Sequence, residues 1–152
     1  MALAVVGLGS NIGHRRSNIE RAVALISALP EVKNFRCSSL IETEPWGFDS
    51  GNRFINACVA FDTDIQPLEL FDRLRNIERH ISAASHRDAS GAYIDRIIDI
   101  DFIAYDTLRL STPRLILPHP RAAERDFVMI PFDEIAPALC VKIKGMFTDN
   151  CS

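Results

Sequence analysis

Apolar residues along this chain form short continuous runs that alternate with one-sided stripes. Ala2–Val6 is an apolar run ended by glycines, which is typical of a buried strand, and Gly7–Arg16 is expected to follow as a loop. The next stripe has helical spacing and predicts an amphipathic helix. Its members are Ile19, Ala22, Val23, Ile26 and Leu29. We expect Ser17 to cap this helix, Glu20 to complete a capping box, and Pro30 to end the helix.

The middle of the chain repeats this alternation of strand and helix. Val32–Thr43 and Phe54–Thr63 have the composition of strands, and the second is rich in aromatic and β-branched residues. Pro67 suits the first turn of a second helix, which we expect to face the same core as the first. Its apolar stripe consists of Leu68, Phe71, Leu74, Ile77 and Ile81.

The remaining segments complete an α+β order. Ser82–Tyr93, rich in Ser, Ala and Gly, predicts a surface loop. Beyond it we expect a strand, a hairpin and a short helix, at Ile97–Tyr105, Leu108–Leu117 and Arg121–Phe132. The order predicts a ferredoxin-like βαββαβ core, an antiparallel sheet with both helices on one face, followed by extra C-terminal strands and a short helix. No repeat or linker divides the chain, so residues 1–152 are expected to form one domain.

Composition and charge narrow the class of protein. Apolar residues make up 47% of the 152 residues and charged residues 24%, so the chain is an ordinary globular protein rather than a disordered one. The net charge of -3 argues against a protein that coats nucleic acid or an anionic membrane. The four cysteines form no C-x-x-C pair, so neither a zinc site nor a disulfide framework is predicted. With no signal peptide or membrane span, we expect a cytoplasmic protein with free thiols.

Two carboxylates stand inside the apolar segment Ile97–Tyr105. Asp99 and Asp101 are two residues apart, so on a strand they share one face. The opposite face is expected to carry Ile98, Ile100, Phe102 and Ala104. Two like charges on a mostly buried strand need a cation, either Arg96 or a divalent metal such as Mg²⁺, which binds carboxylates together with substrate phosphates. From spacing alone, an edge strand with a solvated polar face is an equal alternative.

Basic residues gather in the same part of the sequence. They are Arg87, Arg96, Arg114, His119, Arg121 and Arg125. Guanidinium groups make paired contacts with phosphate oxygens, so arginines opposite a metal site would suit a polyphosphate. Each arginine taken singly is better explained as a surface residue, and only the combination with Asp99 and Asp101 favours a phosphate site.

Two loops carry weaker signals. Gly7–Gly13 lies between a strand and a helix, but Ile12 stands where the dinucleotide fingerprint G-x-G-x-x-G needs glycine, and no Walker motif occurs. Any ATP site must therefore be of another kind. The turn-rich segment Thr43–Asn56 carries three aromatic residues that could sandwich a flat heterocycle or fold back on the core.

Eight short motifs run in order along nearly the whole chain. They are Gly9-Ser10-Asn11, Thr43-Glu44-Pro45-Trp46-Gly47, Phe54-Ile55-Asn56-Ala57, Ile77-Glu78-Arg79, Asp95-Arg96-Ile97-Ile98-Asp99-Ile100-Asp101, Leu117-Pro118-His119-Pro120, Arg125-Asp126-Phe127-Val128 and Pro131-Phe132-Asp133-Glu134-Ile135-Ala136-Pro137. Each motif alone is common, but eight in this order are not expected by chance. Together they resemble the 6-hydroxymethyl-7,8-dihydropterin pyrophosphokinase family of folate biosynthesis.

The resemblance implies a reaction and a site. The β,γ-pyrophosphoryl group of ATP would pass to the hydroxymethyl oxygen of 6-hydroxymethyl-7,8-dihydropterin, releasing AMP, with two Mg²⁺ ions held by Asp99 and Asp101. Arg96 would contact phosphate and assist the transfer. The nucleotide site would be formed by Glu78, Arg96, Phe102, Arg114, His119 and Arg125. The pterin would be held by Thr43, Pro45, Trp46, Phe54, Asn56 and Phe127. A monomer whose only partners are these two small molecules is expected.

Three positions depart from the family pattern. Ser82-Ala83 stands where many members have Gly-Arg, so a phosphate-facing arginine is absent there, and Arg87 is the expected catalytic replacement. Tyr93 stands in place of a tryptophan and Pro120 in place of a tyrosine. A second hypothesis therefore stays open: a ferredoxin-like domain that binds nucleotide or pterin for regulation, without catalysis.

Overall fold

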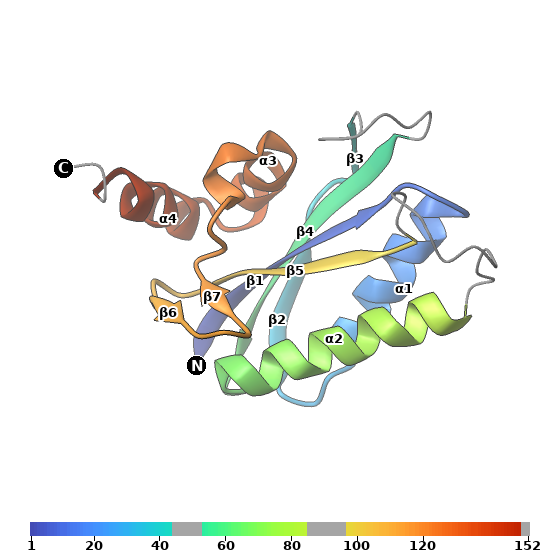
Figure 1. The fold of residues 1–152 in the computed structure, drawn as a ribbon, viewed down its shortest axis with the longest axis horizontal. Coiled ribbons are helices and arrows are strands. Elements are labelled where there is room, and N and C mark those ends of the chain that lie inside the picture. Colours follow the sequence, from blue (N-terminus) through green and yellow to red (C-terminus); the bar gives the residue numbers. More distant parts are fainter. Residues whose placement is uncertain (44–52, 85–96, 150–152) are drawn as a thin grey trace.

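The computed structural model describes residues 1–43, 53–84 and 97–149, and these residues form three layers (Figure 1). Within them the central layer is an antiparallel sheet of order β2-β4-β1-β5, with β3 paired to β4. The strands are β1 (Ala2–Ser10), β2 (Val32–Cys37), β3 (Ile41–Thr43), β4 (Phe54–Thr63) and β5 (Asp99–Tyr105). Helices α1 (Arg15–Ser27) and α2 (Pro67–Ala84) cover one face. The other face carries the 3₁₀ helix η1 (Ala122–Glu124), α3 (Asp126–Ile135) and α4 (Pro137–Asp149).

The first core lies between the sheet and the two long helices. Ile19 and Ile26 of α1 are buried together with Leu70 and Leu74 of α2, and Phe61 of β4 packs against them from the sheet. Each such side chain contributes about 1.5–3 kcal/mol when it is removed from water. The prediction that both helices face one core is therefore confirmed.

The second core lies on the opposite face of the same strands. Cys58 and Ala60 of β4 are buried there against Phe132 of α3 and Ile143 of α4. The predicted short helix at Arg121–Phe132 corresponds to η1 and most of α3. The sequence did not predict α4. The apolar side of this helix is explained only by the second core, which the sequence did not reveal.

The segment from β1 into α1 differs from the prediction. β1 continues through both glycines to Ser10, because it pairs along this length with β4 on one side and β5 on the other. α1 begins at Arg15 with no side-chain cap at its start, so the predicted Ser17 and Glu20 capping box is wrong. Inside the helix, Asn18 donates from Nδ2 to the Ile12 carbonyl (3.2 Å) and to Ser10 Oγ (3.2 Å), and these bonds hold the preceding turn.

The predicted strand Val32–Thr43 is divided into β2 and β3. Between them Ser38 bonds to Cys58 of β4 through its backbone N–H (2.9 Å) and accepts the Cys58 N–H at its hydroxyl (2.9 Å). The carboxylate of Glu134 in α3 accepts the Ser39 N–H (2.9 Å). These contacts fasten the third layer to the sheet.

A bulge interrupts the pairing of β1 with β5. Val5 pairs with Ala104 and Val6 with Phe102, so Ile103 is an extra residue. Ile103 and Ala104 consequently both belong to the second core, and the prediction that Ala104 shares a face with Phe102 is wrong. The other three apolar residues of the predicted face, Ile98, Ile100 and Phe102, do lie together in the first core.

The chain between the sheet and η1 forms a small antiparallel hairpin, β6 (Leu110–Ser111) with β7 (Ile116–Leu117), within the predicted segment Leu108–Leu117. The predicted loop Ser82–Tyr93 begins inside α2, which runs to Ala84, and the rest of it lies outside the described residues. Among the described residues, no helix combines the length and apolar character that a bilayer span requires.

Candidate functional site

Three adjacent strands bring predicted site residues to one end of the sheet. Gly9 of β1 pairs with Asn56 of β4 on one side and with Asp99 of β5 on the other. Neighbouring strands lie about 4.8 Å apart, so the Cα atoms of Asn56 and Asp99 are roughly 10 Å apart across the glycine. Ala57 and Ile100 point into the first core, so Asn56 and Asp99 project from the opposite face, where α3 lies. This part of the sheet is a floor with Asn56 and Asp99 at its two sides and a residue without a side chain, Gly9, between them.

Gly9 leaves space that neighbouring side chains occupy. A Cβ at this position would lie 2.9 Å from Asn56 Oδ1 and 3.6 Å from Phe54 Cδ1. The Asn56 side chain is itself buried. The carboxamide and the aromatic ring therefore both lie against the Gly9 backbone, an arrangement that any larger residue would displace.

The turn after β1 is built from buried polar residues. Ser10 and Asn11 are fully buried, and Ser10 is held by Asn18 as described above. Gly13 has a φ of 71°, a conformation that favours glycine. The predicted Gly9-Ser10-Asn11 motif is therefore part of the support of the floor.

Asp99 and Asp101 are both half-buried and stand on the same face of β5, as predicted from their spacing. Asp101 pairs across the sheet with Gly7, and Gly7 pairs with Cys58 of β4. Burial raises the pKa of the Cys58 thiol far above its usual value, and the nearby Asp101 charge adds to this shift. Cys58 is thus a neutral core residue and is excluded as a nucleophile.

His119 lies beside the two carboxylates. Its backbone N–H donates to the carbonyl of the bulge residue Ile103 (2.8 Å), and its Nδ1 accepts the N–H of Arg121 (3.2 Å). Burial lowers the pKa of His119, the Arg125 charge lowers it further, and Asp99 acts in the opposite direction. The imidazole is therefore neutral near pH 7 with its proton on Nε2, from which it can donate to an anion.

A cavity of about 260 Å³ opens beside β5. It is lined by Phe71, Arg75, Ile100, Asp101, Phe102, Thr112, Pro113, Arg114, Leu115, Ile116, His119 and Pro120. Two guanidinium groups lie near the ring of Phe71, that of Arg75 at 5.3 Å and that of Arg114 at 5.8 Å from its centroid. Arg114 also pairs with Asp72. Apolar walls with two arginines and a carboxylate suit an anionic ligand that carries a flat apolar part.

Glu78 and Arg75 act together next to this cavity. Glu78 Oε1 pairs with Arg75 Nη1 (2.9 Å), and Glu78 Oε2 accepts the backbone N–H of Ile100 (2.8 Å). Arg75 lines the cavity, and the predicted site residue Glu78 lies next to the cavity through its pair with Arg75. Arg75 was not predicted as a site residue from the sequence. Its position one helical turn before Glu78 could have indicated that the two side chains pair.

The other side of the floor meets the start of α3. Phe127 packs against the second core and is half-buried, and the guanidinium of Arg125 lies 5.7 Å from its ring centroid. Thr43 ends β3 opposite Phe54 of β4. Arg15 holds these strand ends together, since its Nη1 donates to the Arg53 carbonyl (2.7 Å) and lies 3.6 Å from Glu42 Oε1.

Four predicted site residues, Pro45, Trp46, Arg87 and Arg96, lie outside the described residues. Over residues 1–43, 53–84 and 97–149, no three side chains of His, Cys, Asp or Glu gather as a complete metal site. The pair Asp99 and Asp101 fits instead the manner in which Mg²⁺ is held, by one or two carboxylates plus phosphate oxygens.

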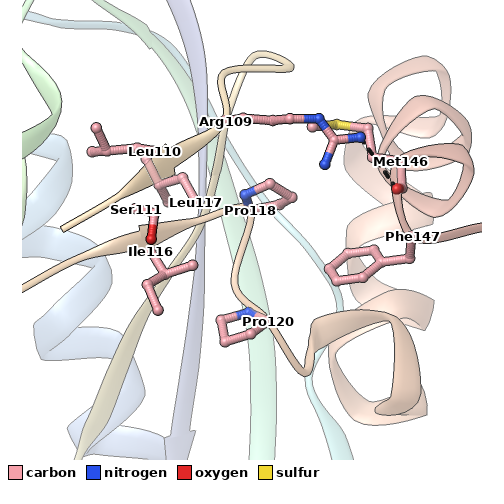
Figure 2. Close-up of a pocket in the computed structure, with 9 residues that line it drawn as sticks. All are labelled: Arg109, Leu110, Ser111, Ile116, Leu117, Pro118, Pro120, Met146 and Phe147. Carbon is pink, nitrogen blue, oxygen red and sulfur yellow. Dashed lines mark hydrogen bonds between the residues drawn. The ribbon is translucent and has the colours of Figure 1, made fainter. Parts of the chain in front are cut away.

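A second cavity, of about 320 Å³, lies between the β6–β7 hairpin and the end of α4 (Figure 2). Arg109 spans it and donates to the Met146 carbonyl (3.2 Å). Its other lining residues are apolar apart from Ser111. Without a carboxylate or any predicted site residue, it is a poorer candidate than the cavity beside β5.

Comparisons with known proteins give this site a context. Residues 5–137 match the family model of 7,8-dihydro-6-hydroxymethylpterin-pyrophosphokinase (HPPK). A 2-amino-4-hydroxy-6-hydroxymethyldihydropteridine pyrophosphokinase of Methylorubrum extorquens is 39% identical over 93% of this chain and 87% of its own length. Enzymes of the same name from Porphyromonas gingivalis and Bacillus subtilis are 36% and 35% identical, over 91% and 97% of this chain and 94% and 86% of their own lengths.

Solved structures agree on the fold. A crystal structure of Plasmodium falciparum HPPK-DHPS with pteroate has a TM-score of 0.67 and 12% identity, covering 97% of this chain. This chain spans only 42% of that longer protein. The match to the family model and the length of the bacterial relatives show that the chain belongs to the 6-hydroxymethyl-7,8-dihydropterin pyrophosphokinase family.

Proposed function

We propose that this protein transfers the β,γ-pyrophosphoryl group of ATP to the hydroxymethyl oxygen of 6-hydroxymethyl-7,8-dihydropterin, releasing AMP, in folate biosynthesis. The observation that carries the proposal is the floor at Gly9, flanked by Phe54 and Asn56 on β4 and by Asp99 on β5. A heterocycle bound over β4 and a polyphosphate bound over β5 would meet above the glycine. Holding both reactants in line is most of what phosphoryl transfer asks of a protein.

The nucleotide is assigned to the cavity beside β5. Its apolar walls and Phe71 would contact the base, while Arg114 and the Nε2 proton of His119 would contact phosphates. Arg125, which reduces the proton affinity of His119, contributes a further positive charge on this side. Phe102 belongs to the wall of the cavity.

Asp99 and Asp101 are assigned as the ligands of two Mg²⁺ ions. They share one face of β5, and Asp101 also lines the nucleotide cavity. Bound Mg²⁺ would neutralise phosphate charge and align the attacking and leaving oxygens. The two carboxylates would hold the ions beside the polyphosphate, and Arg96 and Arg87 are proposed to contact the transferring group.

The pterin is assigned to the β4 side of the floor. Phe54 and Phe127 are proposed to stack on the ring, and the carboxamide of Asn56 to read its amide edge. Thr43, Pro45 and Trp46 are proposed to close the pocket. A buried, oriented amide is suited to this task because it offers a donor and an acceptor side by side.

We further propose the ferredoxin-like arrangement for the whole chain, as one domain over residues 1–152. The strand order β2-β4-β1-β5, with α1 and α2 on one face, supports it. A monomeric, cytoplasmic enzyme with ATP and the pterin as its small-molecule partners is part of the same proposal.

Replacing Asp99 or Asp101 by Ala tests the function. Each variant should lose AMP formation from ATP, Mg²⁺ and hydroxymethyldihydropterin by about 100-fold or more, because phosphate charge is left uncompensated in the transition state. Circular dichroism should show an unchanged fold. Wild-type rates in both variants would exclude the metal assignment, and ligand binding by the wild type without AMP release would support the non-catalytic alternative.

A further inference from the structure

Arg75 and Glu78 of α2 both contact one residue of β5 and also pair with each other. Glu78 Oε2 accepts the Ile100 N–H (2.8 Å), Arg75 Nη2 donates to the Ile100 carbonyl, and Arg75 Nη1 pairs with Glu78 Oε1 (2.9 Å). Both backbone groups of Ile100 are thereby satisfied from the helix. With these partners in place Ile100 is fully buried, so its backbone groups depend on α2 for their hydrogen bonds.

These contacts bear on the two aspartates because of where Ile100 lies in β5. It is the residue between Asp99 and Asp101, and it lies on an edge of the sheet in which β1 is the inner neighbour of β5. In an antiparallel pair, hydrogen-bonded residues alternate with residues whose backbone groups point outward. Ile100 points outward to α2, so Asp99 and Asp101 are the residues that bond inward, to Gly9 and Gly7.

The three residues 99–101 are therefore held from both sides, by β1 through the aspartates and by α2 through Ile100. An edge strand held only on its inner side can twist or fray, and either motion would change the separation of the two carboxylates. We propose that Arg75 and Glu78 are positioning residues that fix the spacing of Asp99 and Asp101 for binding of a divalent cation. This inference rests on the proposed metal role of the two aspartates.

Arg75 also lines the nucleotide cavity, so its loss alone could weaken ATP binding directly. Glu78 is not among the residues that line this cavity, and its carboxylate bonds to Arg75 and to the Ile100 N–H. Glu78→Gln is therefore the informative variant. Its amide oxygen can still accept the Ile100 N–H, but the ion pair that orients the guanidinium is lost.

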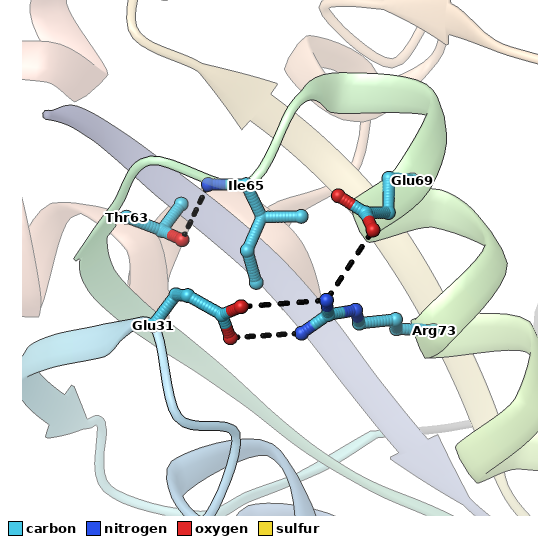
Figure 3. Close-up of polar contacts among 5 residues, drawn as sticks. All are labelled: Glu31, Thr63, Ile65, Glu69 and Arg73. Carbon is cyan, nitrogen blue, oxygen red and sulfur yellow. Dashed lines mark hydrogen bonds and ion pairs between the residues drawn. The ribbon is translucent and has the colours of Figure 1, made fainter.

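The matched control is another arginine of the same helix. Arg73 Nη1 lies 2.9 Å from Glu31 Oε2 and its Nη2 lies 3.3 Å from Glu69 Oε1 (Figure 3). Arg73 is half-buried like Arg75, but its partners hold the start of α2 to the turn before β2 rather than to β5. Arg73→Met removes a comparable ion pair without touching the aspartates.

The experiment measures Mn²⁺ affinity by electron paramagnetic resonance in the presence of a non-hydrolysable ATP analogue, and the KM for the pterin in Mg²⁺. For Glu78→Gln and Arg75→Met we expect the Mn²⁺ dissociation constant to rise by about 10-fold or more, as for other residues that support metal ligands. The KM for the pterin should stay within about 2-fold, since the floor at Gly9 is untouched. Arg73→Met should leave both values at the wild-type level, and Arg75→Lys should recover part of the Mn²⁺ affinity.

Asp99→Asn separates this inference from the proposed function. If Asp99→Asn weakens Mn²⁺ binding but Glu78→Gln, shown to be folded by its thermal transition, does not, the positioning role is wrong and the metal role stands. If Asp99→Asn binds Mn²⁺ as the wild type does, the metal role itself is wrong. If Glu78→Gln does not fold, Arg75→Lys is the deciding variant. A lysine cannot bond to Glu78 and to the Ile100 carbonyl in the paired manner of arginine, so wild-type Mn²⁺ affinity in Arg75→Lys would overturn the proposal.

Discussion

The side-chain oxygen of Asn56 lies over Gly9, 2.9 Å from the place that a Cβ at residue 9 would occupy. Because residue 9 has no side chain, the Asn56 side chain of β4 can lie directly over β1. This contact lies where the proposed pterin and phosphate sites meet. Four predictions follow from this contact and from others in the fold.

Gly9→Ala should displace the Asn56 carboxamide and the edge of Phe54. A shift of this size in a substrate-positioning group is expected to lower kcat/KM for the pterin by about 10- to 100-fold, with the larger part in KM. Steady-state kinetics with each substrate varied in turn would measure it. Gly145→Ala is the control, because a Cβ there meets nothing within 4 Å and the variant should keep full activity. Unchanged pterin kinetics in Gly9→Ala would contradict the assignment of Asn56.

His119 should titrate below its ordinary pKa of 6.5, because of its burial and the nearby Arg125. The unfolded chain then binds more protons than the folded one just below pH 6.5, so stability should rise with pH between the folded pKa and 6.5 and be flat above. An NMR titration of the assigned imidazole would show this. Asp99→Asn should move the midpoint lower and Arg125→Gln should move it higher, and shifts of the opposite sign would refute the proposed surroundings of His119.

The ion pair of Glu31 with Arg73 should contribute to stability only above a certain pH (Figure 3). The hydrogen bond from Arg73 holds the pKa of Glu31 below its ordinary value of 4.5. A depressed carboxyl pKa stabilises the fold above the unfolded pKa, and this contribution is lost as the pH falls through the folded pKa. The Tm difference between wild type and Glu31→Gln should therefore vanish as the pH drops below 4.5. A Tm difference that persists in acid would show that packing, not charge, is responsible.

Ile143→Ala should destabilise the protein by about 2–5 kcal/mol in urea unfolding, because the side chain is fully buried between α4 and the sheet. The control is Val141→Ala on the same helix, where the side chain is 67% exposed and the change should stay within about 0.5 kcal/mol. Equal effects of the two changes would mean that α4 does not pack on the sheet as described.

The sequence predicted most helices and strands where apolar spacing was regular. Phe54–Thr63 and the start of α2 at Pro67 were predicted at their observed bounds, because both have clear periodicity and the helix has a favourable first residue. The extension of β1 to Ser10 was missed because glycines usually end strands, and here the pairing on both sides compensates for their low propensity.

Residues of the candidate site could be predicted from the sequence where the residue type and spacing indicate the chemistry. They could not be predicted where their role depends on how the helices and strands pack. The spacing of Asp99 and Asp101 predicted that they share a face, which the structure confirms, but it left a cation site and a solvated edge strand as equal alternatives. Arg75 was missed because an arginine on an amphipathic helix looks like any solvated charge until the neighbouring strand edge is known. The face of Ala104 was wrong because a bulge leaves no mark in the pattern of apolar residues.

The bulge at Ile103 also limits which insertions and deletions β5 can tolerate. Phe102 and Tyr105 both contact the first core although they are an odd number of residues apart, and their rings meet edge to face at 6.3 Å. Only the extra residue Ile103 makes this possible, since it reverses the parity of the strand between its two ends. Deleting one residue here would turn either the carboxylates into the core or the tyrosine out of it. The strand can therefore gain or lose residues at this point only in pairs, which makes its length as constrained as its aspartates.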